Sequence, residues 1–469
     1  RMRSKTTFLI PKQFILYIFF SALVFQQCNT PATKEDDRII ENYRYNHANW
    51  TRDASVYEVN VRQFSEEGTF YAVEAELDRL RTLGVDILWL MPVHPIGEKN
   101  RKGPMGSYYA VKDYYDVNPE FGTMEDFESL VAAIHDRDMH IIIDWVPNHS
   151  SWDNTLTETH PEFYMKDSVG NFVSPFDWTD VIRFDYENSE LRQDMMDAMK
   201  FWVAEKNIDG FRCDVAHMVP VSFWEELKPV LDSIKPVFML AESDQPELNE
   251  TAFDATYDWK FHHLMNEIGK GNANARAVRE HFEWVDSVYP SDSYLLQFTS
   301  NHDENSWAGT VFDRYGEGAK AFAVLSFTVP GMPLMYNGQE VGLDKMLEFF
   351  TKDAIDWKES PFTDFYRTLN DMKAENQALR NGAAGGEAVF LEIGNDEAVT
   401  AFLRAKDDNK VIVLINLSGA RQQIELNHEQ ITGDYNEVFT GQEVSLSEKH
   451  GLTLRPWEYR VLIRKAVEY

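Results

Sequence analysis

The chain has 469 residues, which is too long for one small domain and suits one large domain with one or two appendages. Its 43% hydrophobic and 26% charged residues exclude collagen-like, coiled-coil and largely disordered proteins. The formal net charge of −32 would repel phosphate backbones and anionic lipid headgroups, so no nucleic-acid partner is expected.

The N-terminal segment, residues 1–28, is predicted to be an export signal. Residues 1–12 carry four basic side chains and no acidic one, and residues 14–25 form a nearly unbroken apolar run that is short for a membrane span. Cys28 follows directly, which resembles a bacterial lipoprotein signal, although two glutamines precede the cysteine. A plain cleaved signal is the alternative. Either way we expect an exported protein, periplasmic or held at the outer membrane or cell surface only by a lipid on Cys28.

From residue 53 the chain alternates short β-rich apolar runs with amphipathic stretches, which indicates a parallel α/β sheet or barrel. The predicted strands number eight, as a closed barrel needs, and span residues 56–61, 87–91, 140–144, 208–213, 237–241, 253–257, 294–299 and 333–336. Apolar residues at helical spacing predict helices over residues 72–83, 124–137, 191–205 and 319–328. We therefore predict a (β/α)8 TIM barrel over residues 53–387, preceded by a linker over residues 29–52.

Two further segments differ from the barrel pattern. Residues 150–188, after the third strand, form a long connection rich in Trp, Asp, Asn and Pro, and loops of that length are usually functional. We predict an inserted loop subdomain there. After residue 388 the pattern changes to period-two runs separated by Gly, Asn and Asp, at residues 388–393, 398–404, 410–416 and 452–464. This predicts a C-terminal antiparallel, β-sandwich-like domain over residues 388–469.

Carboxylates follow several of the predicted barrel strands. The fourth strand leads to Asp214, the fifth to Glu242 and the seventh to Asp303. The carboxyl ends of barrel strands form one rim, where the catalytic groups of such barrels collect, so these side chains are expected to face one pocket. Each residue alone has a simpler explanation as a helix cap, a turn former or a packing residue. Their joint occurrence, in order and at barrel spacing, favours catalysis.

Paired carboxylates point to glycoside hydrolysis. In a retaining glycosidase, two carboxyl groups about 5–5.5 Å apart act as nucleophile and as proton donor. The nucleophile must be ionised while the acid holds its proton. Arg212, two residues before Asp214, projects to the same side of the strand and favours its ionised form. Glu242 has no cation adjacent in sequence, so we expect it to carry the proton.

The segments DWVPNH, GFRCDVAH, LAES and NHD resemble the four signature segments of the α-amylase family of glycoside hydrolases. GVDILWLMPVHP, YAVKDYYDVNPEFGTMEDF and GMPLMYNGQE also match, so the resemblance covers residues 53–345. It implies that Asp214 is the nucleophile, Glu242 the general acid/base, and Asp303 a carboxylate that stabilises the transition state. It also implies a first sugar subsite, with an aromatic floor at Tyr109, formed by Tyr109, Asp144, His149, Arg212 and His302.

The same resemblance implies a structural calcium ion between the barrel and the long loop. Oxygen ligands suit that cation, and Asn148, Asp185 and the main-chain carbonyl of His217 fall where its ligands would lie. The alternative is that Asn148 and Asp185 hydrogen-bond the loop without a metal.

The expected activity is retaining hydrolysis of α-glucosidic bonds, above all α-1,4 bonds, in starch, glycogen or maltodextrins. Ala216 stands where many α-amylases have lysine, and Val215 resembles the residue found in α-1,6-acting oligosaccharidases and neopullulanases. An α-1,6-acting or small-oligosaccharide hydrolase, or a transglycosylase, is therefore the alternative. A surface glycan-binding lipoprotein without turnover is an alternative of another class, against which the three carboxylates argue. The expected partner is an α-glucan oligo- or polysaccharide, and the sequence makes no prediction of oligomeric state.

Overall fold

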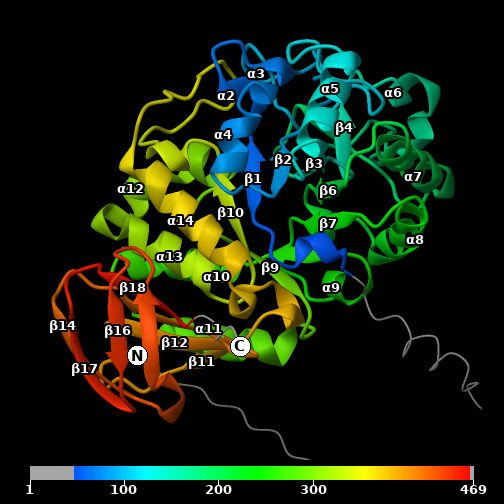
Figure 1. Ribbon diagram of the computed structural model, residues 1–469. Helices are drawn as coiled ribbons and strands as arrows, with labels where there is room; N and C mark the ends of the chain where they lie inside the picture. The colour runs from blue at the N-terminus through cyan, green and yellow to red at the C-terminus, as the bar shows by residue number, and fades with distance from the viewer. Residues whose placement is uncertain (1–46, 465–469) are drawn as a thin grey trace, which may run out of the picture. The chain divides into compact units, whose positions relative to one another are not determined.

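Eight parallel strands close into a barrel in the computed structural model, which describes residues 47–464 (Figure 1). Around the barrel the strand order is β1-β10-β9-β8-β7-β6-β3-β2. In chain order the barrel strands are β1 (Val56–Val59), β2 (Ile87–Leu90), β3 (His140–Trp145), β6 (Gly210–Cys213), β7 (Phe238–Ala241), β8 (Ala255–Tyr257), β9 (Tyr294–Phe298) and β10 (Met332–Tyr336). Each predicted strand segment overlaps one of them, so the predicted TIM barrel is confirmed.

The N-terminal predictions lie outside this part of the chain. The export signal of residues 1–28, with Cys28, and residues 29–46 of the linker are not among the described residues. The predicted domain boundaries stay predictions. Nowhere in residues 47–464 does a helix reach the length and hydrophobicity that crossing a membrane requires.

The barrel strands are apolar on both faces because both faces are covered. Alternate residues point inward and outward, so each strand contributes to two layers. One buried cluster consists almost entirely of strand residues such as Val56 and Trp89 and fills the interior of the barrel. The other joins strand residues such as Tyr57 and Leu88 to the surrounding helices. This alternation decides which side chains reach the inside of the rim.

One strand position accepts only glycine. Gly210, at the start of β6, has φ +152°, and a Cβ atom there would lie 1.8 Å from the carbonyl oxygen of Phe238 on β7. That separation is far inside van der Waals contact, so a larger residue would push the two strands apart. The close approach keeps β6 and β7 in register where the carboxylates follow.

Helices cover the outside of the barrel (Figure 1). They are α3 (Phe70–Glu74), α4 (Leu77–Thr82), α5 (Met124–His135), α7 (Ser189–Ala204), α8 (Val221–Asp232), α10 (Trp259–Gly269), α11 (Arg276–Val288), α13 (Ala319–Thr328) and α14 (Pro361–Glu375). A capping box between Thr123 and Asp126 starts α5. The prediction of one helix over residues 72–83 is wrong, because Glu76 leaves the helical region (φ −98°, ψ 2°) and separates α3 from α4.

Short helical turns connect the larger elements. They are α2 (Val61–Phe64), α9 (Leu248–Thr251), α12 (Val311–Tyr315), the π-helical turn η4 (Glu304–Ala308), and the 3-10 turns η1 (Asn49–Thr51), η3 (Ala216–Met218), η5 (Gly316–Gly318), η6 (Gln339–Val341), η7 (Gln377–Leu379) and η8 (Gly382–Ala384). Two of them, η3 and η4, directly follow catalytic candidates on the rim of the barrel.

The long connection after β3 carries a small sheet of its own. Strands β4 (His149–Ser151) and β5 (Val181–Arg183) pair antiparallel, and α6 (Leu156–Thr159) and η2 (Pro161–Phe163) lie between them in the chain. The N–H of Phe184 then donates to the carbonyl of Asn148 at 3.0 Å. The inserted subdomain therefore begins and ends beside the predicted sugar site.

The C-terminal segment forms two antiparallel sheets, drawn in orange and red in Figure 1. The larger has the order β11-β12-β13-β18-β15-β16 and the smaller pairs β14 with β17. The strands are β11 (Ala388–Phe390), β12 (Val399–Lys406), β13 (Asn409–Asn416), β14 (Gln422–Asn427), β15 (Gly433–Glu437), β16 (Glu443–Leu446), β17 (Lys449–Leu454) and β18 (Tyr459–Arg464), and the turn η9 (Glu429–Ile431) follows β14. The predicted C-terminal antiparallel β-domain is confirmed.

Two details of that domain differ from the prediction. The single strand predicted over residues 452–464 is two strands, because Trp457 adopts a left-handed conformation (φ 56°) and donates its N–H to Ser418. Strands β14, β15 and β16 were not predicted. They are rich in polar residues, and β14 buries only Ile424 and Leu426.

Candidate active site

The register of two neighbouring strands places two carboxylates side by side. Cys213 of β6 pairs with Ala241 of β7, and Asp214 and Glu242 are the next residues of the two chains. The N–H of Glu242 donates to Cys213 O at 3.0 Å, which continues the ladder beyond the strands. Neighbouring strands lie about 4.8 Å apart, so these two carboxylates start from adjacent backbones on the same rim.

Arg212 joins the carboxylates into one network. Its Nη1 lies 2.9 Å from Asp144 Oδ1 and 3.0 Å from Asp214 Oδ1, and its Nη2 lies 3.0 Å from Glu242 Oε2. The guanidinium is fully buried and also donates to the hydroxyl of Tyr257 at 3.2 Å. Arg212 contacts Asp214 as expected, but Glu242, which has no cation adjacent in sequence, has one beside it in the structure. The cation reaches Glu242 from the neighbouring strand.

The carboxylates outnumber the cation that holds them. Burial, and next the negative charge of Glu242, raise the pKa of Asp214 well above its usual value, and Arg212 opposes this shift. Burial also raises the pKa of Asp144 to about 6, again against Arg212. Because like charges in one low-dielectric pocket cannot all ionise, the cluster retains a proton near neutral pH. A nucleophile and a general acid need one proton between them.

His302 and Asp303 extend this cluster from the loop after β9. His302 Nε2 lies 3.2 Å from Asp303 Oδ2, and its Nδ1 lies 2.5 Å from Oε1 of Glu58, a fully buried residue of β1. Burial opposes ionisation of both groups. Nevertheless the carboxylates of Asp303 and Glu58 raise the pKa of His302 well above its usual value, and the charge of His302 lowers the pKa of Asp303.

Tyr109 closes one side of the pocket. Its hydroxyl donates to Asp144 Oδ2 at 3.0 Å and lies 2.8 Å from His302 Nε2, and its ring stacks on the imidazole with centroids 5.4 Å apart. Trp89, which points into the barrel, also donates its indole N–H to Asp144 Oδ2, at 3.2 Å. Tyr109 and Asp144 are thereby fixed against the groups that flank them.

His149 approaches from the inserted subdomain. Its Nδ1 faces the amide nitrogen of Asn148 at 3.1 Å, and its Nε2 lies 4.0 Å from Asp214 Oδ2. Burial lowers the pKa of His149 to about 3, so the ring is neutral at physiological pH. With Nδ1 accepting from the amide, Nε2 carries the proton, and its 4.0 Å separation from Asp214 Oδ2 is too long for a direct hydrogen bond. The structure thus brings together the eight residues predicted for catalysis and for the first sugar subsite.

Of the three residues predicted to bind calcium, the structure brings two onto neighbouring segments. Asp185 directly follows Phe184, whose N–H binds the carbonyl of Asn148, so these two predicted ligands come from adjacent chain segments. No described contact links His217 to either. Within residues 47–464, no group of three or more His, Cys, Asp or Glu side chains is placed to hold a metal ion. The donors are hard oxygens with one carboxylate among them, and calcium stays a prediction.

The sequence analysis missed Glu58 and considered Val215 only for bond preference. Glu58 could have been found, because it is a carboxylate near the end of a predicted strand, as Asp214 is. Val215 carries no such signal: it adopts φ 39°, a strained conformation for a β-branched residue, and its N–H donates to Glu242 Oε2 at 2.8 Å. The backbone after Asp214 thereby orients the neighbouring carboxylate.

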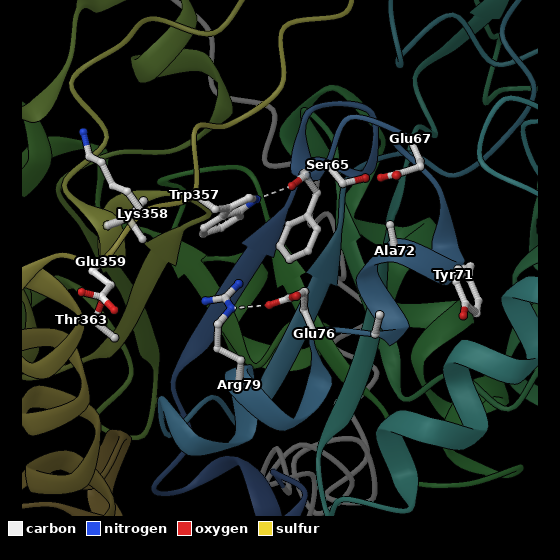
Figure 2. A pocket seen from close by; sticks show the side chains of 13 residues that line it. Ser65, Glu67, Tyr71, Ala72, Glu76, Arg79, Trp357, Lys358, Glu359 and Thr363 are labelled. Atoms are coloured by element: carbon white, nitrogen blue, oxygen red, sulfur yellow. Dashed lines mark hydrogen bonds and ion pairs between the residues drawn. The ribbon is translucent and has the colours of Figure 1, made fainter.

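A separate pocket of about 630 Å³ lies outside this cluster (Figure 2). It is lined by α3, α4 and the segment that follows η6, with Arg79 lying over the ring of Trp357 at 4.5 Å and paired with Glu76 at 2.6 Å. Tyr71 stands at its edge, and none of the predicted site residues lines it. This outer pocket is distinct from the carboxylate cluster.

Known proteins share the fold and most of the sequence pattern. The family model for the α-amylase catalytic domain matches residues 45–183 and 163–409, and the model for the C-terminal domain of the α-amylase SusG matches residues 399–461. The α-amylase MalA of Haloarcula japonica is 28% identical over 393 residues, which cover 79% of this chain and 56% of that protein.

Solved structures agree with these matches. A maltogenic α-amylase from Thermotoga neapolitana, AmyB, is 30% identical with a TM-score of 0.81, covering 88% of this chain and 98% of that one. An α-amylase from Lactobacillus plantarum is 29% identical with a TM-score of 0.80, covering 89% of this chain and 100% of that one.

Proposed function

The chain belongs to the α-amylase family of glycoside hydrolases, and we propose that it hydrolyses α-glucosidic bonds, above all α-1,4 bonds, in starch, glycogen or maltodextrins. The observation that carries this proposal is the pairing of Asp214 and Glu242 on one buried guanidinium, at the ends of adjacent strands. Two neighbouring carboxyl groups, one a nucleophile and the other a proton donor, are what retaining hydrolysis requires.

In the first step Asp214 attacks the anomeric carbon while Glu242 protonates the leaving oxygen. The glycosidic C–O bond breaks, a covalent glycosyl ester forms on Asp214, and the shortened glucan leaves with the proton. In the second step ionised Glu242 removes a proton from water, whose oxygen displaces Asp214. Both steps invert the anomeric carbon, so the α configuration is retained.

The surrounding groups position the sugar and balance its charge. Asp303 is held ionised by His302 and faces the positive charge that develops on the sugar ring. Tyr109 offers an aromatic face to the C–H groups, while Asp144, neutral His149 and protonated His302 offer hydrogen-bond partners to the hydroxyls.

Replacement of the proposed nucleophile tests the mechanism. Asp214→Asn should lower kcat on maltodextrins by more than the about 10²–10⁴-fold typical of lost acid–base catalysis, because the covalent route disappears. Asp408→Asn, an exposed change of the same kind on the C-terminal sheets, should leave kcat unchanged. Reducing-end release gives kcat, and NMR of the first product gives its anomeric form. Undiminished turnover by Asp214→Asn, or a β-anomeric first product, would contradict the proposal.

Bond type is a second question, raised by Val215 directly after Asp214 and by the maltogenic α-amylase among the solved relatives. An α-1,6-acting or small-oligosaccharide hydrolase, or a transglycosylase, uses the same double displacement. Products formed from amylose, pullulan, panose and maltotriose distinguish these activities. A glycan-binding protein without turnover would instead bind these substrates and release no reducing ends.

Two further properties are proposed from the sequence. A calcium ion bound by Asn148, Asp185 and the carbonyl of His217 would brace the inserted subdomain, and no catalytic step above depends on it. Export through residues 1–28, with a lipid on Cys28, would place the enzyme in the periplasm or at the outer membrane or cell surface. Labelled fatty acid should be incorporated by the wild type and not by Cys28→Ser.

A further inference from the structure

A large aromatic side chain stands exposed beside the carboxylate cluster. Trp307 lies in η4, four residues after Asp303, and 59% of its surface is accessible to solvent. Its side chain also hydrogen-bonds the carboxyl of Asp303, which adds to the lowering of that group's pKa by His302. That hydrogen bond holds one edge of the indole, while the exposed remainder of the ring gains little from packing.

Trp307 belongs to a row of rings that starts inside the pocket. Tyr109, already stacked on His302, lies nearly parallel to Phe349 with centroids 6.4 Å apart and an interplanar angle of 13°. Phe349 is 5.5 Å from Trp307, which in turn is 6.1 Å from Phe350. We call Tyr109, Phe349, Trp307 and Phe350 the aromatic row. It leads from the proposed reacting sugar out to solvent.

The backbone beneath the row is fixed by hydrogen bonds between two loops. Asn305 donates to Lys345 O at 3.0 Å and accepts from the N–H of Leu347 at 2.9 Å, and the hydroxyl of Ser306 donates to Leu347 O at 3.1 Å. These bonds tie η4 to the segment that carries Phe349 and Phe350. The exposed ring is therefore mounted on a rigid support.

A buried arginine anchors the far side of the same segment. Arg62 is 1% exposed and donates to Phe349 O at 3.1 Å, and the N–H of Met105 donates to Phe350 O at 3.0 Å. A surface held in place before its ligand arrives loses little conformational entropy on binding. Such preorganisation is typical of a binding surface and is not needed by a solvated loop.

We propose that the aromatic row binds the glucose units of an α-glucan chain beyond the unit at the carboxylates, with Trp307 as its main platform. The inference rests on the proposed function and extends it to longer substrates. Flat rings pack against the C–H faces of sugars, and a neutral chain suits a protein of net charge −32 better than another copy of that protein does. Because the aromatic row is continuous with Tyr109, the chain that binds it is the same glucan whose bond is cleaved.

The test measures how affinity depends on chain length. In the full chain carrying Glu242→Gln, which removes the proton donor and slows turnover, Kd is measured by calorimetry for maltose, maltotriose and maltoheptaose. Adding Trp307→Ala should raise the Kd for maltoheptaose about five- to tenfold and the Kd for maltose by a smaller factor. Trp307→Tyr in the same position should restore most of the affinity. Tyr71→Ala, which removes a 74% exposed ring from the outer pocket, should change no Kd.

The outcomes separate this inference from the proposed function. If wild type hydrolyses α-glucans and Trp307→Ala binds maltoheptaose as tightly as its parent, the aromatic row is not a glucan platform. If wild type neither hydrolyses nor binds any α-glucan, the proposed function fails first, and the inference with it. If Trp307→Ala changes only the mass measured by sedimentation, the row is an interface between copies, and the inference is overturned.

Discussion

Arg212 sets the charge balance of the site because it contacts three carboxylates at once. A single guanidinium cannot keep Asp144, Asp214 and Glu242 all ionised in a buried pocket, so a proton stays with them. The proton needed for the leaving group is therefore stored before the substrate binds. Turnover requires this proton on Glu242 and an ionised Asp214, whose pKa is raised by burial and by the charge of Glu242 and lowered by Arg212.

Glu58 affects the site through one neighbouring residue, His302, and not by contact with the proposed sugar. It binds the far nitrogen of His302 at 2.5 Å, is 0% exposed, and helps keep the imidazole protonated against the cost of burial. Glu58 is thus a positioning residue: it orients His302 and maintains its charge next to Asp303. Its role should be visible in a pH profile.

Glu58→Gln should narrow the pH range of activity from the alkaline side. The His302 pKa is raised in the native protein, so its charge is present below that pKa and lost as pH rises through it. Removing the negative charge of Glu58 lowers the His302 pKa, so the alkaline limb of kcat/KM should move to lower pH and the loss of activity should be largest at alkaline pH. Glu98→Gln, on a 74% exposed side chain, is the control. A uniform loss at every pH would indicate a purely structural role.

At the scale of elements, parallel strands and the inserted subdomain contribute differently. Strands β3, β6 and β7 hold Asp144, Arg212 and the two reacting carboxylates through ladder hydrogen bonds, which make the rim rigid. The inserted subdomain supplies His149 from β4, which forms a separate two-stranded sheet with β5. A bound cation would stabilise this subdomain in its position beside the pocket.

Chelation should lower the melting temperature if calcium stabilises the inserted subdomain. A ligand that binds only the folded state at 100 times its Kd stabilises it by about 2.7 kcal/mol, which excess chelator removes. Differential scanning calorimetry with and without chelator measures the shift. Asp185→Asn should make the melting temperature insensitive to chelator, whereas Asp177→Asn, exposed in the same subdomain, should preserve the sensitivity. Equal melting curves of wild type with and without chelator would refute a structural calcium.

At the scale of the whole molecule, Arg404 connects the C-terminal sheets to the barrel. This residue of β12 is 1% exposed and donates to the carbonyls of Thr328 and Val329 at the end of α13, at 3.1 and 3.0 Å. It also donates to Gly386 at 2.8 Å and Arg380 at 3.2 Å. Hydrogen bonds as well as apolar packing therefore hold the C-terminal domain against the barrel.

Arg404→Met should destabilise the protein by about 3–5 kcal/mol, because it leaves several buried carbonyls without donors at about 1–3 kcal/mol each. Urea unfolding followed by far-UV circular dichroism gives the free energy of unfolding. Arg455→Met, on a side chain that is 75% exposed, should change it by less than about 0.5 kcal/mol. A loss of that small size in Arg404→Met would mean that apolar contacts alone join the domains.

The sequence by itself determined the barrel, the C-terminal β-domain and which carboxylates stand at strand ends, because strand and helix periods and short motifs are local properties of the chain. It did not determine that Arg212 also holds Glu242, that Glu58 reaches His302, or that Trp307, Phe349 and Tyr109 form one row. Only the tertiary structure decided these, since each joins segments distant in the chain. Their contact depends on barrel closure and loop packing, which leave no periodic signal in any one segment.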